Sequence, residues 1–151
     1  MNKLTYTIDV NAPKEKVWDA MLGDKTYIEW TEVFHKGSYF EGNWEKGSEI
    51  KFLAEDDGKL SGMYSRIAEN IPYAFVSIEH LGEIIDGKVD TKSERGRQWT
   101  GSHENYVFTE SNGVTTVKVD LESGNISDEF EKMFEGMWPK ALEKLKEVAE
   151  R

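Results

Sequence analysis

The feature that most restricts the fold of this chain is a long amphipathic segment at its C-terminal end, residues 127–150. Ser127 can cap a helix there, and the acidic residues 128 and 129 complement the dipole of its first turn. At 1.5 Å per residue such a helix would be about 36 Å long. Its apolar side chains recur at helical spacing and fall on one face: Phe130, Met133, Phe134, Met137, Trp138, Ala141, Leu142, Leu145, Val148 and Ala149. A face of this length must be covered by a large apolar surface elsewhere in the chain.

Glycine and proline interrupt this helical pattern at residues 136 and 139. A proline inside a helix costs on the order of 3 kcal/mol and usually kinks it. We therefore expect a bend that lets the helix follow a curved sheet.

The first thirty residues predict a strand that turns directly into two short helices. Apolar residues alternate with polar ones from residue 4 to residue 10, which is typical of a half-buried strand. Asn11 can cap the helix that follows, and Pro13 suits its first turn. Residues 17, 18, 21 and 22 form an apolar stripe at helical spacing, and "DKTYIEW" predicts a second short helix ending near Trp30.

The next hundred residues are dominated by strand patterns separated by turn residues such as "EDDG", "ENIP" and "ESNG". Short turns between consecutive strands indicate an antiparallel meander. The segment "IIDGKVDTKSERGRQ" is expected to be a long polar loop. A twisted antiparallel sheet that curls around the C-terminal helix, an α+β fold, accounts for all of these faces.

Composition excludes several classes of function. With 151 residues and no repeat or linker, the chain is expected to form one domain, residues 1–151. Its net charge of -10 argues against nucleic acids and anionic membrane surfaces as partners. The absence of cysteine excludes disulfides and zinc–thiolate sites, and no apolar run is long enough for a signal peptide or a membrane span. A cytoplasmic protein without membrane insertion is expected.

The ordered motifs of the chain resemble the START-like, Bet v 1-like (SRPBCC) superfamily, and within it the branch of activators of the Hsp90 ATPase. The residues that carry the resemblance span nearly the whole chain: "DVNAPKEKVWDAM", "YIEWTEVFHKGSYFEGNWEKGSEIKF", "VSIEHLGEIIDGKVD", "WTGSHENYVFTESNGVTTVKVDLE" and "MFEGMWPKALEKLKE". The resemblance implies a helix-grip fold, in which a seven-stranded antiparallel sheet grips the long helix, often around an apolar cavity. Relatives bind hydrophobic ligands, cyclise polyketides or act as co-chaperones, so the fold alone does not give the function.

The leading hypothesis is binding of a small hydrophobic or amphipathic ligand between the sheet and the C-terminal helix. An alternative for each candidate residue is that it only fills a closed core. The candidate ligand-binding residues are Trp30, Phe34, Phe40, Trp44, Ile50, Phe52, Met63, Phe75, Tyr106, Phe108, Phe134, Met137 and Trp138.

The histidines at positions 35, 80 and 103 leave a cyclase-like enzyme as an alternative. If the long loop joins its two strands as a symmetric hairpin, His80 opposes His103, and Glu79 opposes Glu104 on the other face. A histidine pair can form a metal site or a proton relay.

The same register places Phe75, Tyr106 and Phe108 on the face opposite the histidines. If these aromatic residues face the helix, the histidines face solvent, and a β-bulge would reverse this. No nucleophile elbow, phosphate-binding loop, zinc-helix motif or calcium loop occurs. The sequence therefore predicts no metal and no cofactor, and favours a binding protein over an enzyme.

A third hypothesis is a protein-interaction domain with a chaperone or another protein as partner, like the Hsp90 ATPase activators. The acidic surface can dock a basic partner, although it also serves solubility. Exposed edge strands are compatible with a monomer or a homodimer. This hypothesis ranks below ligand binding.

Overall fold

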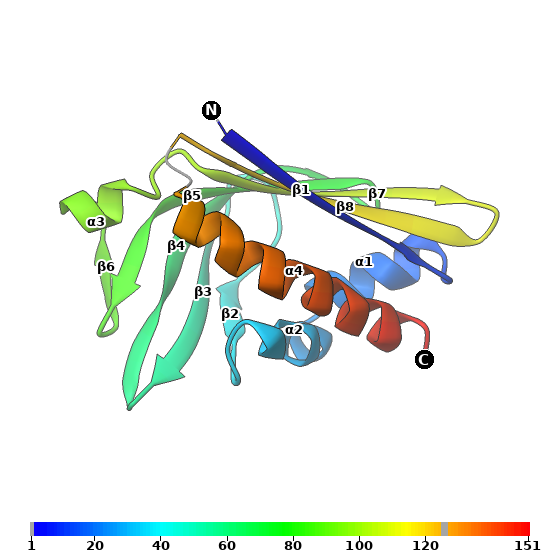
Figure 1. The fold of residues 1–151 in the computed structure, drawn as a ribbon, viewed down its shortest axis with the longest axis horizontal. Coiled ribbons are helices and arrows are strands. Elements are labelled where there is room, and N and C mark those ends of the chain that lie inside the picture. The colour runs from blue at the N-terminus through cyan, green and yellow to red at the C-terminus, as the bar shows by residue number, and fades with distance from the viewer. Residues whose placement is uncertain (1, 125–126) are drawn as a thin grey trace.

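The computed structural model describes residues 2–124 and 127–151, and in it a curved antiparallel sheet wraps around one long helix (Figure 1). The helix, α4 (Asp128–Ala149), crosses the concave side of the sheet. Two short helices and a 3-10 turn close one end of the curl. In chain order the elements are β1 (Asn2–Val10), α1 (Lys14–Leu22), α2 (Asp24–Trp30), η1 (Thr31–Val33), β2 (Tyr39–Gly42), β3 (Glu49–Asp56), β4 (Lys59–Ile71), β5 (Phe75–Ile85), β6 (Lys88–Asp90), α3 (Glu94–Arg97), β7 (His103–Ser111), β8 (Val114–Ser123) and α4.

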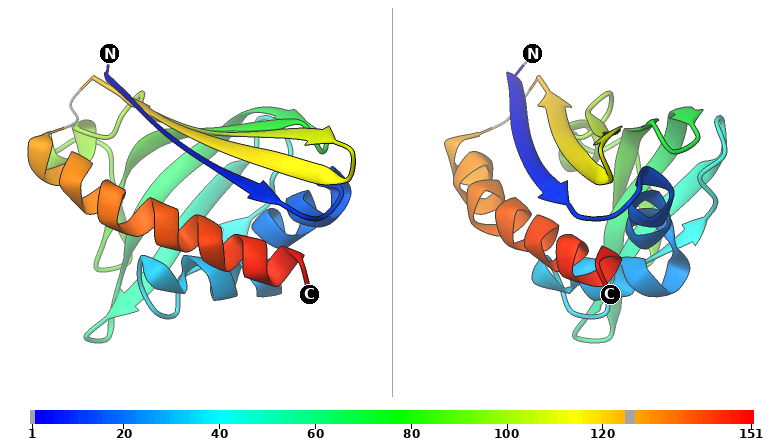
Figure 2. Two further views of the ribbon diagram at one scale, coloured as in Figure 1. Left: turned by 45° about the vertical axis from the view of Figure 1, so that its right-hand side comes forward. Right: turned by 90° about the vertical axis from the view of Figure 1, so that its right-hand side faces the viewer.

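Seven strands form the continuous sheet in the order β1-β8-β7-β5-β4-β3-β2, and each pair is antiparallel. The predicted helix-grip architecture is thereby confirmed. The expectation of a long polar loop was wrong, because that segment forms β6, which pairs with β5, and the short helix α3. Figure 2 shows how β1 and β8 arch over α4.

Tight two-residue turns join three of the hairpins, as the sequence predicted for two of them. Asp57–Gly58 connects β3 to β4, Asp86–Gly87 connects β5 to β6, and Asn112–Gly113 connects β7 to β8. All six residues have φ between 51° and 79°. Asp, Asn and Gly adopt this left-handed conformation most readily, and it matches the twist of the flanking strands.

The corner after β1 differs in detail from the prediction. α1 begins at Lys14, so Pro13 precedes the first turn and Asn11 does not cap the helix. The carbonyl oxygen of Pro13 accepts hydrogen bonds from the backbone N–H groups of Lys16 and Val17. The Asn11 N–H instead donates to a carboxylate oxygen of Glu150 at 2.8 Å, which connects the corner to the end of α4.

α4 is one continuous helix of 22 residues that passes through Pro139. The predicted cap is confirmed, since the Ser127 hydroxyl accepts a hydrogen bond from the Phe130 N–H at 3.2 Å. None of the helices in the described ranges is long and apolar enough to cross a membrane.

Candidate functional site: a cavity under the N-terminal half of α4

The two halves of α4 are buried to different extents. In the C-terminal half, Ala141, Leu142 and Leu145 are wholly buried in a core that includes residues of α1, α2 and β1. In the N-terminal half, Phe130 and Phe134 are only partly buried and Met133 is 40% exposed. The helix therefore closes one end of the curled sheet and leaves space beneath its other end.

This space consists of two adjoining chambers. The aromatic chamber has a volume of about 320 Å³ and lies between η1, β7 and α4. The loop chamber, of about 220 Å³, extends toward residues 98–102 and Ser127. Six residues line both chambers: His80, Trp99, Glu104, Leu121, Phe130 and Phe134. The aromatic chamber is large enough for a small organic molecule.

Seven of the predicted ligand-binding residues line the aromatic chamber: Trp30, Phe34, Phe52, Met63, Tyr106, Phe134 and Trp138. Several of their rings pack edge to face, as Phe34 does on Trp138 with ring centroids 4.9 Å apart. Trp30 is fixed in place because its indole N–H donates to the Met21 carbonyl at 3.0 Å. Their contact with a ligand remains a prediction.

Three of the other candidates belong to packed parts of the molecule. Ile50 is wholly buried in the core. Phe40 and Trp44 pack edge to face with ring centroids 5.3 Å apart, and the Trp44 indole N–H donates to the Leu22 carbonyl at 3.0 Å. The structure places these three residues outside the lining of both chambers.

The last three candidates, Phe75, Phe108 and Met137, also lie outside the lining. Phe108 packs against Trp18 of α1 with ring centroids 5.1 Å apart, at the closed end of the sheet. Phe75 alternates with the wholly buried Val76 and therefore points to the convex face.

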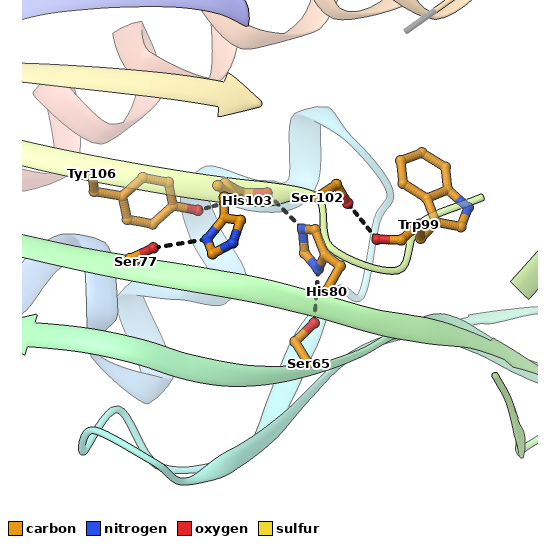
Figure 3. Close-up of polar contacts among 8 residues, drawn as sticks. Ser65, Ser77, His80, Trp99, Ser102, His103 and Tyr106 are labelled. Carbon is orange, nitrogen blue, oxygen red and sulfur yellow. Dashed lines mark hydrogen bonds and ion pairs between the residues drawn. The ribbon is translucent and has the colours of Figure 1, made fainter. Parts of the chain in front are cut away.

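A connected set of polar side chains lies beside the cavity, and Figure 3 shows how they point toward one another. The Ser65 hydroxyl lies 2.8 Å from His80 Nδ1, and His80 Nε2 lies 3.6 Å from Glu104 Oε1. The Tyr106 hydroxyl donates to Glu104 Oε2. We assign the ring proton to Nε2, which faces the negatively charged carboxylate without hydrogen-bonding to it, so that Nδ1 accepts from the Ser65 hydroxyl. We call Ser65, His80, Glu104 and Tyr106 the polar pole.

The negative charge of Glu104 acts on two buried tyrosines. Burial raises the pKa of Tyr106 well above its ordinary value, and the neighbouring Glu104 raises that pKa further. Burial and, to a smaller extent, Glu104 also raise the pKa of Tyr27, which lines the aromatic chamber. Both phenols therefore remain neutral hydrogen-bond donors near pH 7.

The predicted histidine pair does not form. In the observed register Glu79 pairs with His103 and Ile78 with Glu104, one residue away from the symmetric hairpin. The register places the two histidines on opposite faces of the sheet: His80 is 9% exposed and lines both chambers, whereas His103 lies 3.2 Å from Ser77 and borders only the loop chamber. The prediction that Glu79 opposes Glu104 and that both histidines share one face was wrong.

Sequence reasoning missed nine residues of the aromatic chamber: Tyr27, Thr31, Ser38, His80, Trp99, Glu104, Leu121, Phe130 and Met133. Phe130 and Met133 were on the predicted apolar face of the helix, so that signal was available. The loop that carries Trp99 has no such pattern. It is held by the His80 backbone, whose N–H donates to the Ser102 carbonyl at 2.9 Å and whose carbonyl accepts from Gly101 at 3.0 Å.

Most of the cavity lining is apolar, and its polar side chains are concentrated at the polar pole. This arrangement suits an amphipathic ligand. A histidine beside a carboxylate can also transfer a proton, as the enzyme hypothesis requires. No cluster of three His, Asp or Glu side chains suited to a metal ion occurs among the described residues.

Comparisons with known proteins agree with this architecture. The model of a family described as activator of Hsp90 ATPase homolog 1-like protein matches residues 11–150. The chain matches no curated protein sequence.

Solved structures with the same fold cover nearly the whole chain. The solution structure of the Aha1 dimer from Colwellia psychrerythraea has a TM-score of 0.73 and 18% identity over 99% of this chain and 97% of that one. A solution structure from Cytophaga hutchinsonii has a TM-score of 0.72 and 20% identity, covering 97% of this chain and 92% of that one. A crystal structure from Chromobacterium violaceum has a TM-score of 0.68 and 16% identity, covering 99% and 98%. At these identities the likeness establishes the fold.

Proposed function

This chain belongs to the activator of Hsp90 ATPase homolog 1-like family, and we propose that it binds a small hydrophobic or amphipathic molecule in the cavity under α4. The observation that carries the proposal is the pair of adjoining chambers, whose shared lining is mostly aromatic or aliphatic. Such a cavity would lose its hydration on ligand binding, and burial of apolar ligand surface contributes about 25 cal/mol per Å².

A neutral apolar fluorophore tests the proposal. N-phenyl-1-naphthylamine is expected to bind the wild-type protein with one-to-one stoichiometry and an increase in emission. Native mass spectrometry of the freshly purified protein would show whether a cellular molecule already occupies the site.

A cavity-filling variant locates the bound fluorophore. Leu121 lines both chambers, so Leu121→Phe should weaken binding by about ten-fold while the protein stays folded. Leu60→Phe adds the same volume near the start of β4, outside the lining, and should leave binding unchanged. Equal binding by wild type and Leu121→Phe would contradict the proposed site.

The family description supports a second candidate function, contact with an Hsp90-type ATPase. In that case the chain would act as a co-chaperone, and its partner would be a protein. Addition of the purified protein to an Hsp90 should then raise the ATPase rate in proportion to its concentration. An unchanged rate, together with no binding in a pull-down, would remove this candidate and leave ligand binding intact.

A further inference from the structure

We propose that the polar pole selects an organic cation, so that the preferred ligand of the cavity is an ammonium group attached to an apolar body. This inference rests on the proposed ligand-binding function and adds the chemical class of the ligand. Three features of the cavity favour such a ligand: the charge of the lining, the geometry of Glu104 and the surrounding aromatic rings.

The charges that line the cavity have one sign. Glu104 lines both chambers, and Glu122 lines the loop chamber. Among the described residues that line the chambers, none is Lys or Arg. The chain as a whole carries a net charge of -10, which adds a long-range attraction for cations.

The Glu104 carboxylate has one oxygen in use and one available. Its Oε2 accepts the hydrogen bond from Tyr106, while Oε1 lies 3.6 Å from His80 Nε2, too far for a hydrogen bond. Within the described part of the chain, no donor lies within hydrogen-bond distance of Oε1. A partly buried carboxylate next to an apolar cavity gains from a compensating positive charge. A ligand ammonium group supplies that charge and donates to Oε1.

The surrounding aromatic rings favour the same ligand class. Trp30, Phe34 and Trp138 line the aromatic chamber, and Trp99, Phe130 and Phe134 line both chambers. Neighbouring rings meet at different angles: the Trp99–Phe130 pair at 69° and the Phe34–Trp138 pair at 67° are steeply inclined, whereas Phe130 and Phe134 are stacked at 20°. The face of an aromatic ring attracts a cation, so a lining this rich in aromatic rings favours a positively charged ligand.

A ligand with a carboxylate would meet the opposite conditions. It would face the negative charge of Glu104 across a low-polarity cavity, and no Lys or Arg among the described lining residues would offset the repulsion. A neutral alcohol can hydrogen-bond to Oε1 but gains neither charge pairing nor cation–π attraction. The expected order of affinity is therefore ammonium, alcohol, carboxylate.

Four probes with one naphthalene body test this order by isothermal titration calorimetry. They are 2-naphthylmethylammonium, its N,N,N-trimethyl form, 2-naphthylmethanol and 2-naphthoate. In the wild-type protein the two cations should bind about ten-fold more tightly than the alcohol, and naphthoate more weakly than the alcohol.

Glu104→Gln removes the charge and keeps an amide oxygen that can accept from the Tyr106 hydroxyl. In this variant the advantage of the cations over the alcohol should fall to about two-fold, with the affinity for the alcohol unchanged. Glu55→Gln changes the net charge by the same amount at an exposed position of β3 outside the lining, and should keep the wild-type order.

Each other outcome overturns a specific claim. Equal binding of ammonium and alcohol by the wild type would leave a ligand pocket without selectivity for cations. An undiminished cation advantage in Glu104→Gln, or tightest binding of naphthoate, would also overturn the inference. If none of the four probes and no apolar fluorophore binds, the ligand-binding function itself fails, and the inference fails with it.

Discussion

At the scale of single residues, the Thr115 hydroxyl connects the corner after β1 to the neighbouring strand. Thr115 is wholly buried, and its Oγ1 donates to the carbonyl oxygen of Ala12 at 2.7 Å. Ala12 precedes Pro13, which holds this part of the chain in an extended conformation and leaves the carbonyl without a helical partner. The abrupt turn from strand to helix therefore depends on a side chain about a hundred residues later in the sequence.

We expect Thr115→Val to lower the free energy of unfolding by about 1–3 kcal/mol, because the buried Ala12 carbonyl loses its donor without a change in side-chain volume. Urea unfolding followed by tryptophan fluorescence measures the change. Thr116→Val is the matched control, since its hydroxyl donates to Asp9 at the surface and its loss should change stability by less than about 0.5 kcal/mol. Equal effects of the two substitutions would show that the corner does not depend on this bond.

At the scale of elements, the two halves of α4 have different roles: one packs into the core and the other covers the cavity. The C-terminal half supplies small and branched side chains that pack fully, and the N-terminal half supplies large aromatic ones that stand over the cavity. The N-terminal end contacts the rest of the fold less, so its stability depends more on the cap at Ser127.

Ser127→Ala should lower the free energy of unfolding by about 1 kcal/mol, whereas Ser127→Asp should keep wild-type stability because a carboxylate also caps and complements the dipole. Hydrogen exchange of the amides in the first turn of α4 should accelerate in the alanine variant alone. The exposed Ser111 at the end of β7 is the control position, where Ser111→Ala should have no such effect.

The sequence predicts the helices and strands themselves better than it predicts the face of the sheet on which a given side chain lies. α4 and the strand alternation of β1 are local patterns, and the structure confirms both. The face on which His80 lies is a matter of register, and two irregularities near Ala68 and Leu81 interrupt the β4–β5 pairing. One residue of slip moves every side chain to the other face, so Glu104 could not be placed beside His80 from the sequence.

At the scale of the whole molecule, the sheet is a curved shell that is filled at one end and hollow at the other. α1, α2 and the second half of α4 fill the first end, and the polar pole and aromatic rings line the second. The overall fold was predictable because every amphipathic face needs a partner. The lining of the cavity was not predictable to the same extent. Only seven of the thirteen expected residues line the aromatic chamber, and loop residues such as Trp99 complete it.

Alkaline pH should destabilise the whole molecule through its buried phenols. The pKa values of Tyr27 and Tyr106 are raised by burial in the folded protein, so the unfolded chain releases these protons near pH 10 while the folded one keeps them. The unfolded state then binds fewer protons, and stability falls as pH rises above 10, by about 1.4 kcal/mol per pH unit for each tyrosine.

Urea unfolding at a series of pH values between about 9 and 11.5 measures this slope. The range spans the ordinary tyrosine pKa of about 10. Tyr106→Phe should make the decline with pH less steep, and a further Tyr27→Phe should flatten it again. Parallel curves for wild type and both variants would mean that other groups cause the alkaline loss of stability.

The indole rings around the cavity give the protein a built-in optical signal. Of its five tryptophans, Trp30, Trp99 and Trp138 line the chambers, and the rings of Trp30 and Trp138 lie 6.0 Å apart. A guest molecule that displaces water there changes the polarity around three emitters at once. Ligands of this protein can therefore be sought without labels, by measuring the emission wavelength and intensity of its tryptophan fluorescence as the compounds of a library are added.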